Sequence, residues 1–313
     1  MKLCPFGDTG MNVSEVGLGA WQLANPDWGV NDKVEALQIV QKSLEAGCNF
    51  FDTAPGYGGG RSEELLGEGL KSVRKDVILC TKFSYYNENH EREWKAEHVR
   101  PVLEGSFKRL QTDYVDILLL HSPPRELMDG NVSAGLYAEL EKLKTEGQIR
   151  EYGVSLDWKI ELENVLETTK SKAAEVFFNA LYQEMLPAFP KAQAQGMGLI
   201  VKVPLDSGWL SGRYRGKQKF DDVRSRWSPE VLARRNDLVE KFAALVPEGT
   251  SLIHAALQFV LVQPEVSTVI PGAKTVEQAL DNFAAADKQL SAETVQAMRD
   301  LWAREIESDP LPW

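Results

Sequence analysis

The segment Asn49-Phe50-Phe51-Asp52-Thr53-Ala54-Pro55-Gly56-Tyr57 is the stretch from which the fold of this chain is best predicted. It opens with a short apolar run that ends at a carboxylate, Asp52, and a phenol, Tyr57, follows five residues later. The proline and the glycines that come after Asp52 predict a loop. We therefore expect a buried strand that presents two ionisable groups at its carboxyl end, which is where α/β proteins bind ligands.

Two further apolar runs also end at ionisable side chains. The run 77–81 is followed by Lys82, and the run 115–120 is followed by His121. If the three runs are neighbouring parallel strands, then Asp52, Tyr57, Lys82 and His121 converge at one edge. Taken singly, the aspartate would fit an Asx turn and the tyrosine a half-buried ring. The prediction of a site therefore depends on the four groups together.

Apolar runs alternate with helix-like segments along the whole chain. Strands are expected at 16–21, 49–52, 77–81, 115–120, 149–154, 176–179, 199–203 and 266–270, and helices at 33–46, 63–71, 97–110, 133–145, 159–170, 187–195, 229–245, 251–262 and 275–285. This order predicts an α/β fold, a (β/α)8 TIM barrel, with an N-terminal β-hairpin in 2–13 and an extra C-terminal helix at 291–305. A doubly wound sheet is the alternative, disfavoured because no Gly-x-Gly-x-x-Gly follows a strand. We expect one barrel domain over residues 1–313.

Composition limits the classes of partner. The chain has 313 residues and a formal net charge of −11, which disfavours nucleic acid and anionic membranes as partners. Its three cysteines have no CxxC spacing, so neither a disulfide framework nor a metal site is predicted. The first residues lack an apolar signal core. We expect a cytoplasmic monomer or small homo-oligomer that acts on a small molecule.

The sequence resembles the aldo-keto reductases from Val16 to about Phe283. The resemblance lies in Asp-Thr-Ala…Tyr-Gly…Ser-Glu-Glu…Leu-Gly after residue 51, in a Thr-Lys strand end and in a Leu-Leu-His strand end. It implies that Tyr57 is the general acid for carbonyl reduction, that Lys82 lowers its pKa, that Asp52 anchors Lys82, and that His121 positions the carbonyl. Because the four groups include no nucleophile or metal cluster, hydride is expected to come from a nicotinamide.

Two segments are expected to bind the cofactor phosphates. Residues 204–213, rich in small side chains, follow the seventh strand and resemble the Pro-Leu…Gly-x-Leu-x-Gly-Lys segment of the family; residues 270–274 open a helix whose N-terminus favours an anion. With the positions that the resemblance adds, the expected cofactor-binding residues are Trp21, Ser155, Asn179, Lys202, Pro204, Leu205, Ser207, Leu210, Arg213, Gly272, Lys274, Gln278, Asp281 and Asn282.

Three positions depart from the family pattern. Leu156 stands where an asparagine usually follows the serine, Asn179 is assigned to the strand-six glutamine that binds the carboxamide, and Lys202 replaces an aromatic residue. An ammonium cannot stack on a cationic ring. We therefore expect Lys202 to turn away from the ring and to bind a cofactor or substrate oxygen.

The expected function is interconversion of an aldehyde or ketone and its alcohol with NADP(H), with NAD(H) possible. Lys274 and Arg213 favour the phosphorylated cofactor. The alternatives are an aldose dehydrogenase of the same family and a cofactor-binding regulatory subunit; a glycosidase would need a second carboxylate beside Asp52. The residues expected to line or cover the pocket are Trp21, Tyr85, Tyr86, the loop 123–130, Trp227, Trp302, Pro312 and Trp313.

Overall fold

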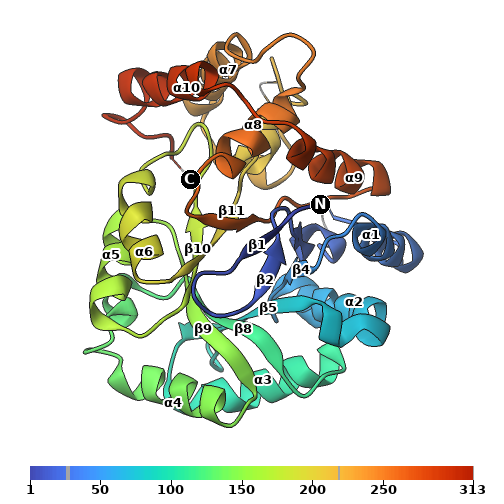
Figure 1. Cartoon of the computed structure of the whole chain (residues 1–313), viewed down its shortest axis with the longest axis vertical. Helices are drawn as coiled ribbons and strands as arrows, with labels where there is room; N and C mark the ends of the chain where they lie inside the picture. Colours follow the sequence, from blue (N-terminus) through green and yellow to red (C-terminus); the bar gives the residue numbers. More distant parts are fainter. Residues whose placement is uncertain (26–28, 218, 313) are drawn as a thin grey trace.

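A curved sheet of parallel strands forms the centre of the molecule. The computed structural model describes residues 1–25, 29–217 and 219–312. Within these residues eight strands follow one another in the order β3 (Leu18–Gly19), β4 (Phe50–Asp52), β5 (Ile78–Phe83), β8 (Val115–His121), β9 (Ile149–Leu156), β10 (Ala173–Phe177), β11 (Gly198–Lys202) and β12 (Val266–Val269). Figure 1 shows them at the middle of a ring of helices.

The first and last strands close the sheet into a barrel. Parallel bridges join Val16 to Val269 and Gly19 to Gly272. Between them the Val269 amide donates to the Glu15 carbonyl at 3.0 Å, and the Gly17 amide donates to the Val269 carbonyl at 2.8 Å. The predicted (β/α)8 barrel is thereby confirmed.

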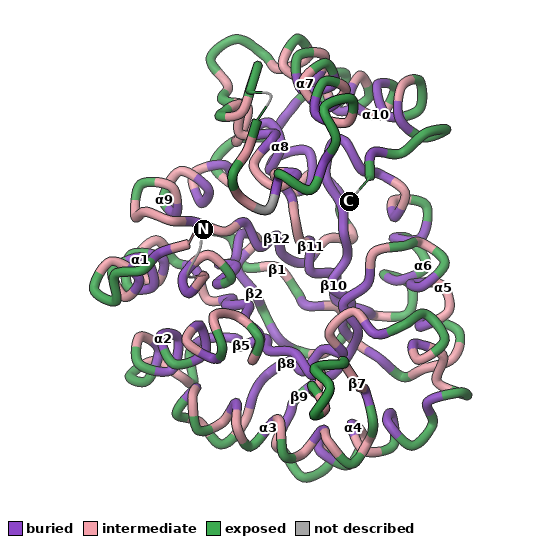
Figure 2. Tube along the Cα trace, turned by 180° about the vertical axis from the view of Figure 1, so that it is seen from behind, coloured by how far each residue is buried: buried purple, intermediate pink, exposed green. Residues whose placement is uncertain are grey.

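Helices cover the outside of the barrel (Figure 1). They are α1 (Lys33–Glu45), α2 (Arg61–Leu70), α3 (Ala96–Leu110), α4 (Ala134–Thr145), α5 (Lys159–Thr168), α6 (Phe189–Ala194), α7 (Pro229–Ala243), α8 (Leu252–Leu261), α9 (Val276–Ala284) and α10 (Ala292–Glu305). The predicted C-terminal helix is α10, which packs on α7 beyond the ring. Figure 2 shows buried strands inside and helices that expose only their outer faces. No helix in the described part of the chain is long and apolar enough to cross a bilayer.

The predicted N-terminal hairpin is formed by β1 (Leu3–Pro5) and β2 (Asn12–Ser14), and it closes the amino end of the barrel. The Phe6 ring is fully buried, and its centroid lies 6.3 Å from that of Phe50. A Cβ on Gly198, at the start of β11, would lie 2.5 Å from this ring, so the glycine makes room for Phe6. The opposite, carboxyl end of the barrel is left for the ionisable groups.

Several local expectations were wrong. Ser62, which stands just before the predicted helix 63–71 and is expected there to cap it, does not cap α2; its hydroxyl accepts from Thr53 Oγ1 at 2.8 Å and donates to the Ala20 carbonyl at 3.0 Å. Strand β10 begins at Ala173 rather than at residue 176, and a short hairpin of β6 (Tyr85–Tyr86) and β7 (Arg92–Glu93) follows β5.

Candidate functional site

Four ionisable groups lie together at the carboxyl end of β4, β5 and β8, as the sequence predicts. Lys82 Nζ lies 2.6 and 2.7 Å from the two carboxylate oxygens of Asp52 and 3.1 Å from the Thr53 carbonyl. The same nitrogen lies 5.3 Å from the centre of the Tyr57 ring, which meets the His121 ring edge-on at 5.8 Å. The strand ends therefore place an acid, a phenol, an ammonium and an imidazole within contact range.

Burial sets the protonation state of the phenol and of the imidazole. Burial raises the pKa of Tyr57; the Lys82 ammonium opposes this effect, but burial outweighs it. The net shift is therefore opposite to the lowering expected from the lysine alone. Burial, with the charges of Lys82 and Arg92, lowers the pKa of His121 to about 3. At neutral pH the site presents a protonated phenol and an uncharged imidazole.

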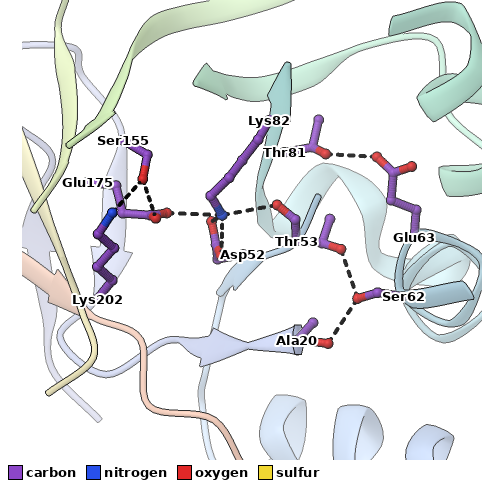
Figure 3. A network of polar contacts seen from close by, with 10 residues as sticks. All are labelled: Ala20, Asp52, Thr53, Ser62, Glu63, Thr81, Lys82, Ser155, Glu175 and Lys202. Atoms are coloured by element: carbon purple, nitrogen blue, oxygen red, sulfur yellow. Dashed lines mark hydrogen bonds and ion pairs between the residues drawn. The ribbon is translucent and has the colours of Figure 1, made fainter. Parts of the chain in front are cut away.

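Glu175, on β10, is the functional-site residue that sequence reasoning missed. It is 3% exposed and faces Lys82 across the barrel, where its Oε2 lies 3.0 Å from Lys82 Nζ. Its Oε1 accepts a hydrogen bond from Ser155 Oγ at 2.9 Å. Figure 3 shows the resulting row of groups from Lys202 through Ser155 and Glu175 to Lys82 and Asp52.

The two carboxylates on Lys82 differ in their surroundings. Burial, together with the charge of Glu175, raises the pKa of Asp52 above its usual range. Burial also opposes ionisation of Glu175, but the ammonium groups of Lys82 and Lys202 outweigh it and hold the pKa of Glu175 below its usual range. The two carboxylates raise the pKa of Lys82 well above that of a free lysine, although burial acts in the opposite direction. Lys82 therefore remains a cation.

Of the three positions that depart from the family pattern, Lys202 forms part of the same row. Lys202 Nζ donates to Ser155 Oγ at 2.9 Å and pairs with Asp157 Oδ1 at 2.8 Å. By contrast, both ends of the Asn179 carboxamide bond the protein backbone. Nδ2 donates to the Val203 carbonyl, and Oδ1 accepts from the Leu181 amide. The strand β10 side chain beside Ser155 is thus Glu175, not Asn179.

The loop after β11 has a left-handed backbone at three successive residues. Asp206, Ser207 and Gly208 have φ of 46°, 54° and 88° within the 3-10 segment Asp206–Ser211, and the Asp206 and Gly208 amides donate to the Val203 and Leu205 carbonyls at 3.1 and 2.8 Å. Arg224 holds the loop from outside by donating to the Ser207 carbonyl at 3.0 Å. Of the residues predicted here, Pro204 and Leu210 are buried, while Ser207 is partly accessible and Arg213 exposed.

Cations gather between this loop and the start of α9. Burial lowers the pKa of Lys274, and the neighbouring charges of Arg224 and Arg213 lower it further. Thr275 caps α9 by accepting from the Gln278 amide, so the positive end of the helix dipole lies here as well. This donor set fits an anionic group such as a cofactor phosphate.

The remaining predicted cofactor residues support the backbone of this region. Gln278 Oε1 accepts from the Lys274 amide at 2.9 Å, and Asn282 Nδ2 donates to the Gly272 carbonyl at 3.3 Å. Asp281 faces His254 on α8, with Oδ1 and Nε2 2.9 Å apart.

The expected pocket-lining residues divide into two groups. Trp21 is 43% exposed with its ring 6.0 Å from that of Tyr57, so it borders the mouth; Tyr86 is also exposed. Trp227 and Trp302 are buried among other aromatic rings, away from solvent. Trp313 lies outside the described residues.

Arg92, on β7, is a second residue of the site that sequence reasoning did not single out. Its guanidinium lies 4.8 Å above the Trp94 ring and donates to the His121 carbonyl.

Comparisons with known proteins identify the family. The model of the aldo/keto reductase family matches residues 15–303. L-galactose dehydrogenase of Arabidopsis thaliana is 33% identical over 91% of this chain and 88% of its own length. An NADH-specific methylglyoxal reductase of Escherichia coli is 28% identical over 96% of this chain and 98% of its own.

A solved structure shows the same architecture. The holo form of an aldo-keto reductase from Bacillus halodurans superposes with a TM-score of 0.82 at 28% identity, and the match covers 96% of each chain. The barrel, the convergent strand ends and these relatives agree, and the chain belongs to the aldo/keto reductase family of oxidoreductases.

Proposed function

We propose that this protein reduces an aldehyde or ketone to its alcohol with NADP(H), with Tyr57 as the proton donor. The observation that carries the proposal is the phenol beside Lys82 and a neutral His121 at the carboxyl end of the barrel. The carbonyl oxygen lies between the phenol and the imidazole, so Tyr57 supplies the proton and His121 orients the oxygen by a hydrogen bond. The nicotinamide, when bound, supplies the hydride.

The cofactor phosphates are assigned to the loop after β11 and to the start of α9. Arg213 and Lys274 supply positive charge there, beside Arg224, which is already paired with Asp222. NADP(H) carries one phosphate group more than NAD(H), and each nearby cation attracts that group. We therefore favour NADP(H) over NAD(H). The NADH-specific methylglyoxal reductase among the relatives makes NAD(H) the alternative to test.

Oxidation of a sugar is the second candidate function, favoured by the similarity to L-galactose dehydrogenase. The same groups would then act in reverse, with Tyr57 as the base. A panel of carbonyls and sugars, assayed in both directions with both cofactors by nicotinamide absorbance, separates the two. Equal affinity for the two cofactors, unchanged in Lys274→Ala, would argue against the NADP(H) preference.

The decisive variant is Tyr57→Phe, which removes only the phenolic oxygen. We expect hydride transfer, followed by stopped flow, to slow by several orders of magnitude, roughly 10²–10⁴-fold or more, while the cofactor Kd stays near that of the unmodified enzyme. Tyr114→Phe is the matched control, because Tyr114 lies just before β8, at its amino end, under the Arg74 guanidinium. Wild-type hydride transfer in Tyr57→Phe would refute the assignment.

A further inference from the structure

The ammonium of Lys82 lies between two buried carboxylates. Its nitrogen lies within hydrogen-bond distance of both oxygens of Asp52 and of the Thr53 carbonyl. Glu175 Oε2 lies 3.0 Å from the same nitrogen and forms a second buried ion pair with it. A second buried carboxylate on the ammonium, beside the catalytic groups, points to a functional role.

Glu175 is a second acidic partner of Lys82, in addition to Asp52. The second ammonium of the row, Lys202, bonds Ser155 and pairs with Asp157 rather than touching Glu175. The group therefore holds two cations, Lys82 and Lys202, against three carboxylates. Lys82 itself is flanked by two of these carboxylates, Asp52 and Glu175.

Tyr57 is a neighbouring phenol on which these charges act. The charged and titratable groups that face it are Lys82 on β5, Asp52 on β4, Glu175 on β10, Arg92 on β7 and the neutral His121 on β8. A phenolate at this position would be attracted by Lys82 and repelled by both carboxylates. Each buried carboxylate therefore favours the phenol that keeps its proton.

We propose that Glu175 is a positioning residue that acts through Lys82: as a second counter-ion it offsets the ammonium and holds Tyr57 in the proton-bearing form. The inference rests on the proposed function, because Tyr57 must be the proton donor for its protonation to matter. Reduction of a carbonyl requires the phenol, whereas oxidation of an alcohol requires the phenolate. Glu175 thus adapts the site to reduction over a wide pH range and confines oxidation to alkaline pH.

The direct test follows the ionisation of Tyr57 without cofactor or substrate. Fluorotyrosine at position 57 has a more acidic phenol than tyrosine, which brings its titration into the range that a folded protein tolerates, and its ¹⁹F chemical shift reports ionisation. In Glu175→Gln we expect the midpoint to move to lower pH, with about tenfold more phenolate at a given pH below the midpoint. Glu175→Leu, also uncharged, should move it the same way.

Glu151→Gln is the matched control. It removes a buried strand carboxylate that pairs with Lys144 on the outside of the barrel, at 2.7 Å. In Glu151→Gln, the ¹⁹F titration midpoint of fluorotyrosine at position 57 should match that of the protein without this substitution. A midpoint unchanged in both Glu175 variants, with native circular dichroism, would overturn the proposal, as would a shift of equal size in Glu151→Gln.

The pH profile of alcohol oxidation gives a second readout. Because removal of a negative charge stabilises the phenolate, the rising limb of kcat/KM should move to lower pH in Glu175→Gln. A limb that stays in place would overturn the inference. If the ¹⁹F titration shifts but no alcohol or carbonyl reacts, the proposed function has failed and the inference about Tyr57 has not.

Discussion

At the scale of single residues, the barrel interior fixes which groups carry protons. Lys82 is charged because two carboxylates lie within 3.0 Å of its nitrogen. The phenol of Tyr57 stays protonated because burial disfavours its anion. The ionisable set is therefore a single electrostatic unit, and a change at one member alters the others.

His121 gives a prediction about pH. Its pKa, lowered to about 3 by burial and by the neighbouring cations, lies below the usual assay range. Above about pH 4 the imidazole is therefore neutral, and kcat/KM for reduction should show no histidine limb near pH 6.5. Loss of activity at acid pH with a midpoint near 6.5, absent in His121→Gln, would contradict this.

At the scale of elements, a buried carboxylate ties α2, β5 and α3 together. Glu63, in the first turn of α2, is fully buried; Oε1 accepts from Thr81 Oγ1 at 2.7 Å, and Oε2 lies 2.7 Å from Arg109 Nε. The place of Glu63 in the first turn of a helix indicates by itself only a favourable interaction with the helix dipole. The structure adds two partners from other elements.

Loss of this carboxylate should weaken the fold. In Glu63→Ala the Thr81 hydroxyl and the Arg109 guanidinium lose their acceptor, so we expect the unfolding free energy to fall by about 2–4 kcal/mol. Because Arg109 is partly exposed and water can replace the lost carboxylate, the loss should lie toward the smaller value. Urea unfolding followed by circular dichroism measures it. Glu64→Ala, at the exposed neighbouring position, should change stability by less than about 0.5 kcal/mol, and equal losses in the two variants would disprove the role.

The sequence predicts elements well where their apolar pattern is uninterrupted. Strands β4 and β5 begin with uninterrupted apolar residues, and β8 has four in a row after Asp116; the ends of the three strands place Asp52, Lys82 and His121 correctly. Strand β10 carries a carboxylate at its centre, and a charge inside a fully buried strand contradicts the pattern by which such strands are recognised. Glu175 was missed for this reason, since only the partners Lys82 and Ser155, distant in sequence, make its burial possible.

At the scale of the whole molecule, stability and chemistry lie at opposite ends of the barrel. Phe6 and the hairpin fill the amino end, whereas every predicted catalytic group lies at the carboxyl end. This division is typical of the (β/α)8 fold. Changes at the amino end should therefore alter stability without altering the reaction.

Phe6→Ala tests this separation. Removing a fully buried ring leaves a cavity between the hairpin and Phe50, so we expect about 3–5 kcal/mol lower stability. The Tyr57-dependent kcat/KM of the remaining folded protein, assayed well below its Tm, should stay within about twofold of the unmodified enzyme. Leu3→Ala, at a position 52% exposed, is the control. A large fall in kcat/KM at constant folded fraction would show that the two ends are coupled.

Closure of the barrel by Gly17 and Val269 has a consequence for biosynthesis. Roughly 250 residues separate the two positions, so at about 5–20 residues per second the ribosome needs on the order of 10–50 s to deliver the second after the first. During that interval the nascent chain presents the unpaired edge of β3, to which other strands can add. Translation speed and chaperone access, rather than the strength of any single contact, are therefore expected to govern the yield of this protein in a cell.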